Sequence, residues 1–219
     1  MVSLKNLNQA LTNSERRSIE RLNTPSRIQS FLDRLAYSTD GTYRCPLRVL
    51  RERTGHCFDG ALLAAAMLSR LGQPPLILEL LPNERDDDHL LAVFKRNGQW
   101  GALANSNFAG LRFREPIYRD VRELVMSYFE QFYNVASEKT LRGYTRPLNL
   151  KAFDKHLWMT QDEPLELIAR RLDHIGRVSL LSEDMIKNLS PVDARSYRSG
   201  LLGANKAGLY RPTRNIRSH

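Results

Sequence analysis

The most continuous apolar stretch of the chain covers residues 57–71, where nearly every position is apolar. A helix without a polar face is expected to be buried, and the Gly and two Pro residues within 72–75 end it. Three short apolar runs of strand length follow, at 76–81, 89–94 and 99–104. Asn97-Gly98 between the last two runs is typical of a hairpin turn. A buried helix followed by an antiparallel sheet predicts an α+β fold.

Helical periodicity also appears on both sides of this central region. Segment 43–53 is expected to be an irregular or helical approach to the buried helix. We predict a core at residues 1–146 that includes N-terminal helices, and a helical C-terminal lobe at 147–219 that ends in a basic tail. Residues 143–147 are the best linker candidate. The further helices are predicted at 14–22, 26–37, 121–133, 150–159, 163–175 and 180–189.

The composition is that of an ordinary folded protein, with 219 residues, 42% of them apolar and 26% charged. It excludes collagen, low-complexity disorder and a disulfide-dense module. The formal net charge of +9 is concentrated at the two ends, because residues 1–55 carry ten basic against five acidic side chains and residues 191–219 carry six against one. The stretch from 190 to 219 predicts an extended or mobile arm. Such an arm either keeps the protein soluble or attracts an acidic partner.

The expected location is the cytoplasm. No apolar run approaches the roughly 20 residues that cross a bilayer, and the N-terminus lacks the pattern of a secretory signal. The two cysteines, Cys45 and Cys57, are expected to be free thiols of a reduced compartment.

Cys57 and His89 are the candidate nucleophile and base. Cys57 begins the buried helix, where unpaired N–H groups favour the thiolate and the rigid helix behind it can serve as a mount. His89 opens a strand directly after three aspartates, at a sheet edge that a substrate can reach. Cys45 has no such setting and is predicted to be structural.

The third member of the site depends on the register of the hairpin. Opposite residues of an antiparallel pair project from the same face. A three-residue loop 96–98 places His89 opposite Asn105, a two-residue turn places it opposite Ser106, and a loop 97–99 places it opposite Asn107. Each of these side chains can accept a hydrogen bond from the imidazole, and a Cys/His/Asn set recurs in thiol hydrolases.

These residues resemble the transglutaminase-like superfamily within the papain-like cysteine hydrolase fold. The matching motifs are Gly55-His56-Cys57, Asp59-Gly60-Ala61, Leu71-Gly72, Pro74-Pro75, Asp88-His89 and Gly98-x-Trp100, and the resemblance covers roughly residues 25–133. It implies a thiolate at Cys57, a base at His89 and an orienting group near Asn105, with Asn107 as the second choice. The family uses Asp as the orienting group, and this chain has none there; either an Asn replaces it or activity is reduced or lost.

The chemistry that follows is acyl transfer to water or to an amine, on a protein or peptide-like amide substrate. No cofactor and no metal is expected. A zinc site at His56, Cys57 and His89 is the weaker alternative, because a fourth ligand is missing. The second hypothesis is a non-catalytic module whose basic ends contact an acidic protein or nucleic acid. A membrane is not expected as a partner, and the oligomeric state stays open.

Overall fold

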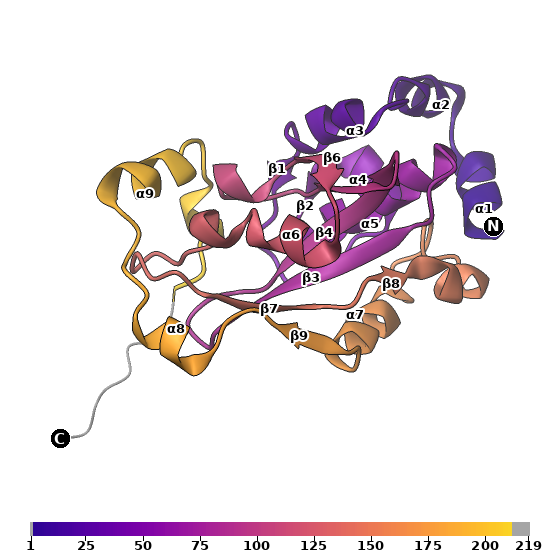
Figure 1. Cartoon of the computed structure of the whole chain (residues 1–219). Helices are drawn as coiled ribbons and strands as arrows, with labels where there is room; N and C mark the ends of the chain where they lie inside the picture. The colour runs from indigo at the N-terminus through magenta and orange to yellow at the C-terminus, as the bar shows by residue number, and fades with distance from the viewer. Residues whose placement is uncertain (1, 212–219) are drawn as a thin grey trace.

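The computed structural model describes residues 2–211 and shows a mixed α+β fold, as the sequence predicts (Figure 1). Within these residues the main sheet has seven strands in the order β6-β5-β4-β3-β7-β9, and β8 pairs with β3. The bounds of the strands are β3 Leu76–Pro82, β4 His89–Arg96, β5 Gln99–Leu103, β6 Arg114–Tyr118, β7 Leu141–Thr145, β8 Leu148–Asn149 and β9 Arg177–Ser179. A separate parallel pair joins β1 Ala36–Tyr37 to β2 Thr54–Gly55.

Helices cover both faces of the sheet. The α-helices are α1 Val2–Ala10, α2 Asn13–Glu20, α3 Pro25–Leu32, α4 Pro46–Glu52, α5 Cys57–Arg70, α6 Val121–Met126, α7 Leu165–Asp173, α8 Glu183–Lys187 and α9 Ala194–Gly200. The 3-10 helices are η1 Ala109–Leu111, η2 Phe129–Gln131, η3 Leu150–His156 and η4 Lys206–Gly208. No helix within residues 2–211 is both long and apolar enough to cross a membrane.

The predicted buried helix is confirmed as α5, whose residues from Cys57 to Ser69 are all buried. It packs on one face of the sheet because Leu90, Ala92 and Phe94 of β4 share its apolar cluster. The alternate residues Leu91 and Val93 belong to a second cluster with α6 on the other face. Consecutive residues of β4 therefore face opposite layers, and α6 lies in front of the sheet in Figure 1 while α5 lies behind it.

The hairpin between β4 and β5 has the two-residue turn, one of the three predicted registers. Arg96 pairs with Gln99, and the turn residues Asn97 and Gly98 have φ angles of 52° and 80°. Two positive φ values match the right-handed twist of the flanking strands, and Asn-Gly adopts them at low cost.

The C-terminal third packs on the same sheet as the rest of the chain. Trp158, Met159 and three residues of α7 share the cluster of α5, and β9 pairs with β7. The boundary between residues 1–146 and 147–219 stays a prediction. The sequence predicts an extended or mobile arm at the C-terminus, and residues 193–211 differ from this prediction. They contain α9 and η4 and contact the body of the protein. Residues 212–219 of that arm lie outside the described residues.

Candidate active site

The start of α5 is held by a buried carboxylate. Asp59 is completely buried and accepts hydrogen bonds from the backbone N–H groups of His56 (3.0 Å) and Arg44 (2.9 Å). The Arg44 guanidinium lies 3.8 Å from the same carboxylate and is bound on its outer side by Asp40 and Glu52. This network fixes His56 at the N-cap and Cys57 as the first residue of the helix.

The Cys57 thiol is buried, with 2% of the residue exposed, and its Sγ lies 3.2 Å from Nδ1 of His56. Burial raises the pKa of this thiol well above its ordinary value, and the negative charges of Asp88 and Asp87 add to the rise. The nearby backbone N–H of Leu90 lowers the pKa and so opposes the rise. The direction is opposite to the one predicted from the helix start, because loss of solvation outweighs the helix dipole. The resting group is therefore a neutral thiol.

The His89 imidazole is 4% exposed, and its Nε2 lies 2.8 Å from the carbonyl oxygen of Leu111. A carbonyl only accepts, so this hydrogen bond forms when Nε2 carries the hydrogen and Nδ1 has the free lone pair. Burial lowers the pKa of His89 to about 4. The ring is thus neutral near pH 7, with one nitrogen anchored and the other able to accept a proton.

The thiol and the imidazole line different cavities on either side of the first residues of β4. Leu90, the chain neighbour of His89, lines the Cys57 pocket. His89 pairs with Leu80, whose side chain belongs to the cluster on the face opposite α5. The Cys57 pocket and the His89 pocket are therefore adjacent rather than one space, and Asp87 and Asp88 line both.

The predicted orienting residues have other partners. The strand pairing ends at Leu103, and the chain then leaves the ladder before it would reach His89. The Asn105 amide donates to the carbonyl oxygens of Gly55 (2.8 Å) and His56 (3.3 Å). Asn107 bonds the backbone of Asn205. In the hydrogen bonds of the described chain, the group at Nε2 of His89 is a backbone carbonyl and neither asparagine.

Ser106 and Asn107 nevertheless line the His89 pocket. The two-residue turn predicts Ser106 opposite His89, and both lie on this pocket although the ladder stops short of them. The Ser106 hydroxyl accepts the backbone N–H of Phe108 (3.0 Å), which turns the chain toward η1. This turn brings the Leu111 carbonyl to the imidazole.

Three contributors to the site do not follow from the sequence analysis. His56 was weighed only as a zinc ligand, although its position beside Cys57 already signalled a second imidazole at the sulfur. Tyr37 packs its ring at 5.2 Å from the His56 ring and comes from a two-residue strand with no periodic pattern. The Leu111 carbonyl had no sequence signal, because every residue type carries the same backbone acceptor.

The Cys57 pocket has a volume of about 310 Å³, within the range of small-ligand sites. Its carboxyl groups outnumber its basic side chains. The His89 pocket is much smaller, about 50 Å³. Over residues 2–211 no group of three or more His, Cys, Asp or Glu side chains is arranged to hold a metal ion. The acidic residues of the Cys57 pocket are Glu79, Asp87, Asp88, Glu166 and Asp173, and the basic ones are His56 and Arg170.

Comparison with known proteins gives only weak matches. No family model and no curated protein matches the chain. Two solved structures of LapG from Legionella pneumophila match at low identity. One is 17% identical, covers 47% of this chain and 68% of that chain, and has a TM-score of 0.34. The other, of EGTA-treated LapG, is 14% identical, covers 74% and 95%, and has a TM-score of 0.39. At these TM-scores the likeness carries no argument about this chain.

Proposed function

We propose that this protein transfers or hydrolyses acyl groups through Cys57, acting on an amide or peptide bond. The supporting observation is the helix-start thiol itself, whose Sγ lies 3.2 Å from an imidazole nitrogen in a pocket of about 310 Å³. Leu90, the chain neighbour of the neutral and anchored His89, lines the same pocket. The sulfur attacks the carbonyl carbon while His89 accepts the thiol proton, a step that requires the two adjacent pockets to open into one at Asp87 and Asp88, which line both. The imidazolium then gives this proton to the leaving amine as the C–N bond breaks. Water or a second amine takes the acyl group from the sulfur.

In this proposal the Leu111 carbonyl orients the His89 imidazole, in place of the aspartate that the sequence lacks. It holds Nε2–H of His89 at 2.8 Å, which directs the lone pair to Nδ1 and supports the imidazolium once it forms. The backbone N–H of Cys57, at the start of α5 where no intrahelical acceptor exists, can donate to the oxyanion. Because the thiol is neutral at rest, proton transfer accompanies attack and no thiolate–imidazolium pair exists beforehand.

His56 is the competing base. Its Nδ1 is already 3.2 Å from Sγ, and its ring packs on the ring of Tyr37. A base that works in a triad is itself oriented by a hydrogen bond, and His89 meets this requirement through Leu111. We therefore assign proton transfer to His89 and a holding contact on the resting thiol to His56.

The test uses an activated ester, because it acylates a competent thiol whatever the natural substrate is. The full chain is incubated with p-nitrophenyl acetate, and peptide mapping locates the acetyl group. We expect acetylation of Cys57, its loss in Cys57→Ala, and a roughly 10²-fold or larger slowing in His89→Ala. Cys45→Ala and His156→Ala are the matched controls, since both residues lie outside the two pockets.

Acetylation that ignores Cys57→Ala would refute the proposal. If His56→Ala slows the reaction and His89→Ala does not, the base is His56. If folded protein shows no acylation of Cys57, the chain is a non-catalytic module on the same architecture. The reaction belongs in a reducing compartment such as the cytoplasm, where a free thiol persists.

A further inference from the structure

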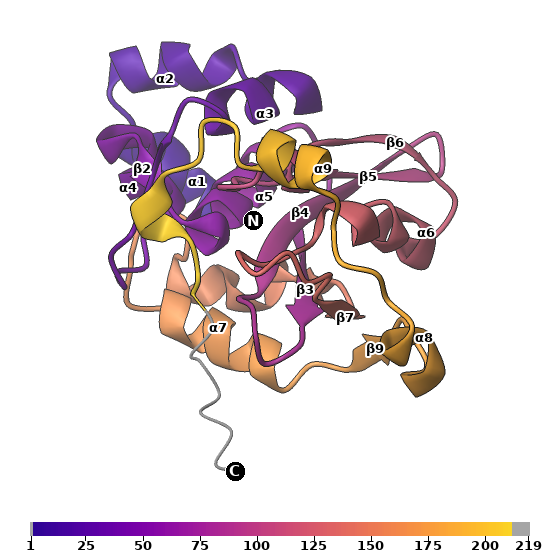
Figure 2. The ribbon, with the colours of Figure 1, turned by 90° about the vertical axis from the view of Figure 1, so that its left-hand side faces the viewer.

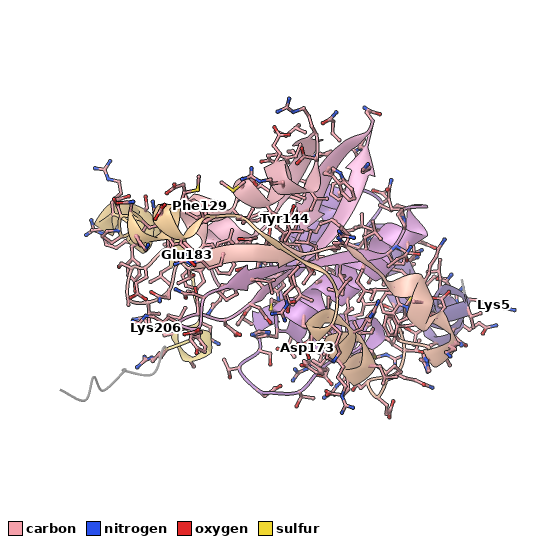
Figure 3. The ribbon with its side chains drawn as sticks, turned by 60° about the horizontal axis from the view of Figure 1, so that its bottom comes forward. Lys5, Phe129, Tyr144, Asp173, Glu183 and Lys206 are labelled. Carbon is pink, nitrogen blue, oxygen red and sulfur yellow. The ribbon has the colours of Figure 1, made fainter. Side chains whose placement is uncertain are left out.

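The C-terminal strap, residues 205–211, crosses the His89 pocket. Gly208 and Tyr210 form part of its lining together with Tyr37 and Asn107. Figure 2 shows this segment running from α9 past β2 and α4 toward α7, and Figure 3 labels Lys206 in it, away from Asp173 at the end of α7. With the strap in place His89 is 4% exposed.

The strap is held at Asn205, through bonds to its backbone and through its side-chain amide, which donates to the Tyr37 carbonyl (3.3 Å). The Asn107 amide bonds Asn205 twice, because its Oδ1 accepts the Asn205 N–H (2.7 Å) and its Nδ2 donates to the Asn205 carbonyl (2.8 Å). Asn205 has an extended backbone, with φ −73° and ψ 107°. One side-chain amide that satisfies both polar groups of an extended residue recognises polypeptide without reading its sequence.

A second contact fixes the strap where it passes the hydroxyphenyl ring of Tyr37. A Cβ at Gly208 would lie 3.0 Å from Cδ1 of this ring and 3.3 Å from Cγ2 of Thr39. The backbone of the strap thus lies directly on Tyr37, whose ring also packs on His56 beside Cys57. A short chain of contacts links the strap to the nucleophile.

We propose that Asn107 and Tyr37 form a binding groove for an extended polypeptide, and that the strap occupies this groove and closes the site until a substrate chain displaces it. The proposal deepens the acyl-transfer function and rests on it for the identity of the substrate. The binding claim stands on contacts that do not involve Cys57. This assigns Asn107 to peptide binding instead of to the orientation of His89.

The test is made in the full chain with Cys57→Ala, so that failure of catalysis cannot be mistaken for failure of binding. Gly208→Val pushes side-chain atoms into Tyr37, and Ala207→Val is the matched control on an exposed neighbour. We expect Gly208→Val to raise the rate at which diethyl pyrocarbonate modifies His89 by about tenfold, because local opening controls access. His156 serves as the internal reference.

Binding of the displaced segment is measured with a fluorescent peptide of residues 203–211. We expect this peptide to bind the Gly208→Val protein about tenfold more tightly than it binds the protein with the unchanged strap. Adding Asn107→Leu should abolish this gain in affinity. Asn205→Pro removes the N–H bonded by Asn107 at a compatible φ, together with the side chain that bonds the Tyr37 carbonyl and caps η4. It should act like Gly208→Val. Hydrogen exchange at 205–211 shows whether the strap is released.

Three results would overturn the proposal. The first is unchanged exchange in both strap variants, because Asn107 and Tyr37 would then not hold the segment. The second is release of the strap without faster His89 modification. The third is release without a gain in peptide binding. If both His89 and His156 are modified faster in Gly208→Val, this variant unfolds globally. Asn205→Pro then decides the question.

Discussion

Acidic side chains outnumber basic ones in the Cys57 pocket, and this sets which molecules can approach the thiol. Five acidic side chains line its pocket against His56 and Arg170. Two of them, Asp88 and Asp87, contribute to the raised pKa of the thiol. A low-dielectric cavity with one sign of charge repels ligands of the same sign, so the pocket favours neutral or cationic groups next to the bond that is attacked.

The measured quantity is the alkylation rate with the anion iodoacetate divided by the rate with neutral iodoacetamide. We expect this ratio to be at least roughly threefold lower for Cys57 than for free N-acetylcysteine. The gap should narrow at high salt, which screens the carboxylates. Asp88→Asn should narrow it as well, whereas Glu84→Gln, on an exposed residue outside the pocket, should leave it unchanged. Equal relative rates in the protein and in the free thiol would contradict this view of the pocket.

The candidate site was predictable in part at the level of residues. A cysteine at a helix start and a histidine at a strand start are visible as positions in the sequence, and both elements begin at those residues. The state of each group was not visible, since the pKa of Cys57 depends on burial and on aspartates brought close by folding. The anchor of His89 is a backbone atom, so no residue type announced it.

The contact between α5 and the segment after β5 is a close one, and it helps to build the site. Asn105 leans over Gly60, where an added Cβ would lie 2.3 Å from Cβ of Asn105. The same asparagine bonds the carbonyl oxygens just before α5. Gly60 therefore lets the helix approach closely enough for these bonds to form.

Gly60→Ala should lower the free energy of unfolding by roughly 2–3 kcal/mol, since the chain must separate two packed backbones or break the Asn105 bonds. Chemical denaturation measures the loss. Gly41→Ala is the matched control, because nothing lies within 4 Å of its added Cβ, and it should change stability by less than about 0.5 kcal/mol. Equal stability of Gly60→Ala and the parent protein would show that the contact relaxes freely.

The strands with a clear apolar period were predicted well, whereas the helices predicted at 26–37 and 121–133 end earlier, at Leu32 and Met126. Strands without such a period were missed. The strands at 76–81, 89–94 and 99–104 match β3, β4 and β5 within two residues at each end. β6 contains Glu115 and Pro116 and pairs at an edge of the sheet, where an unsatisfied ladder position tolerates proline. β7 contains Gly143, packed under the carbonyl of Val178, so tertiary pairing rather than local pattern decides its conformation.

The stability of the whole molecule is tied to pH through a carboxyl group on the central strand. Glu79 of β3 is 6% exposed. Burial, with a hydrogen bond to Asp88 as the second cause, raises its pKa from 4.5 to about 8. Between these values the folded chain binds a proton that the unfolded chain has lost, so this group makes folding less favourable as pH rises through that window.

Glu79→Gln should therefore flatten the pH dependence of the free energy of unfolding between pH 5 and 8. The variant's free energy of unfolding minus that of the parent protein should be about 1–2 kcal/mol larger at pH 8 than at pH 5. Urea denaturation measures this difference. Comparison with the parent isolates Glu79 from His89, whose lowered pKa acts with the opposite sign. Glu84→Gln is the control, and a constant difference across this range would refute the assignment.

The organisation of the whole chain was the part least accessible from the sequence. Its α+β class followed from one helix and three strands, but the docking of both ends depends on contacts between distant residues. The backbone N–H of Val2 donates to Asp154 (3.1 Å), and Tyr133 donates its hydroxyl to the Ser196 carbonyl (2.9 Å). Such pairings follow from the completed fold, and charge counts on the two ends gave no indication of them.

A tethered segment competes with every free molecule for the place that it fills. The link from α9 to Asn205 is only a few residues long, and short links hold a ligand at an effective concentration on the order of millimolar. A dilute peptide in solution would rarely displace the strap from the groove. The groove would then serve chains delivered to it by a docked carrier, or those released to it after a protease has trimmed the end of the protein.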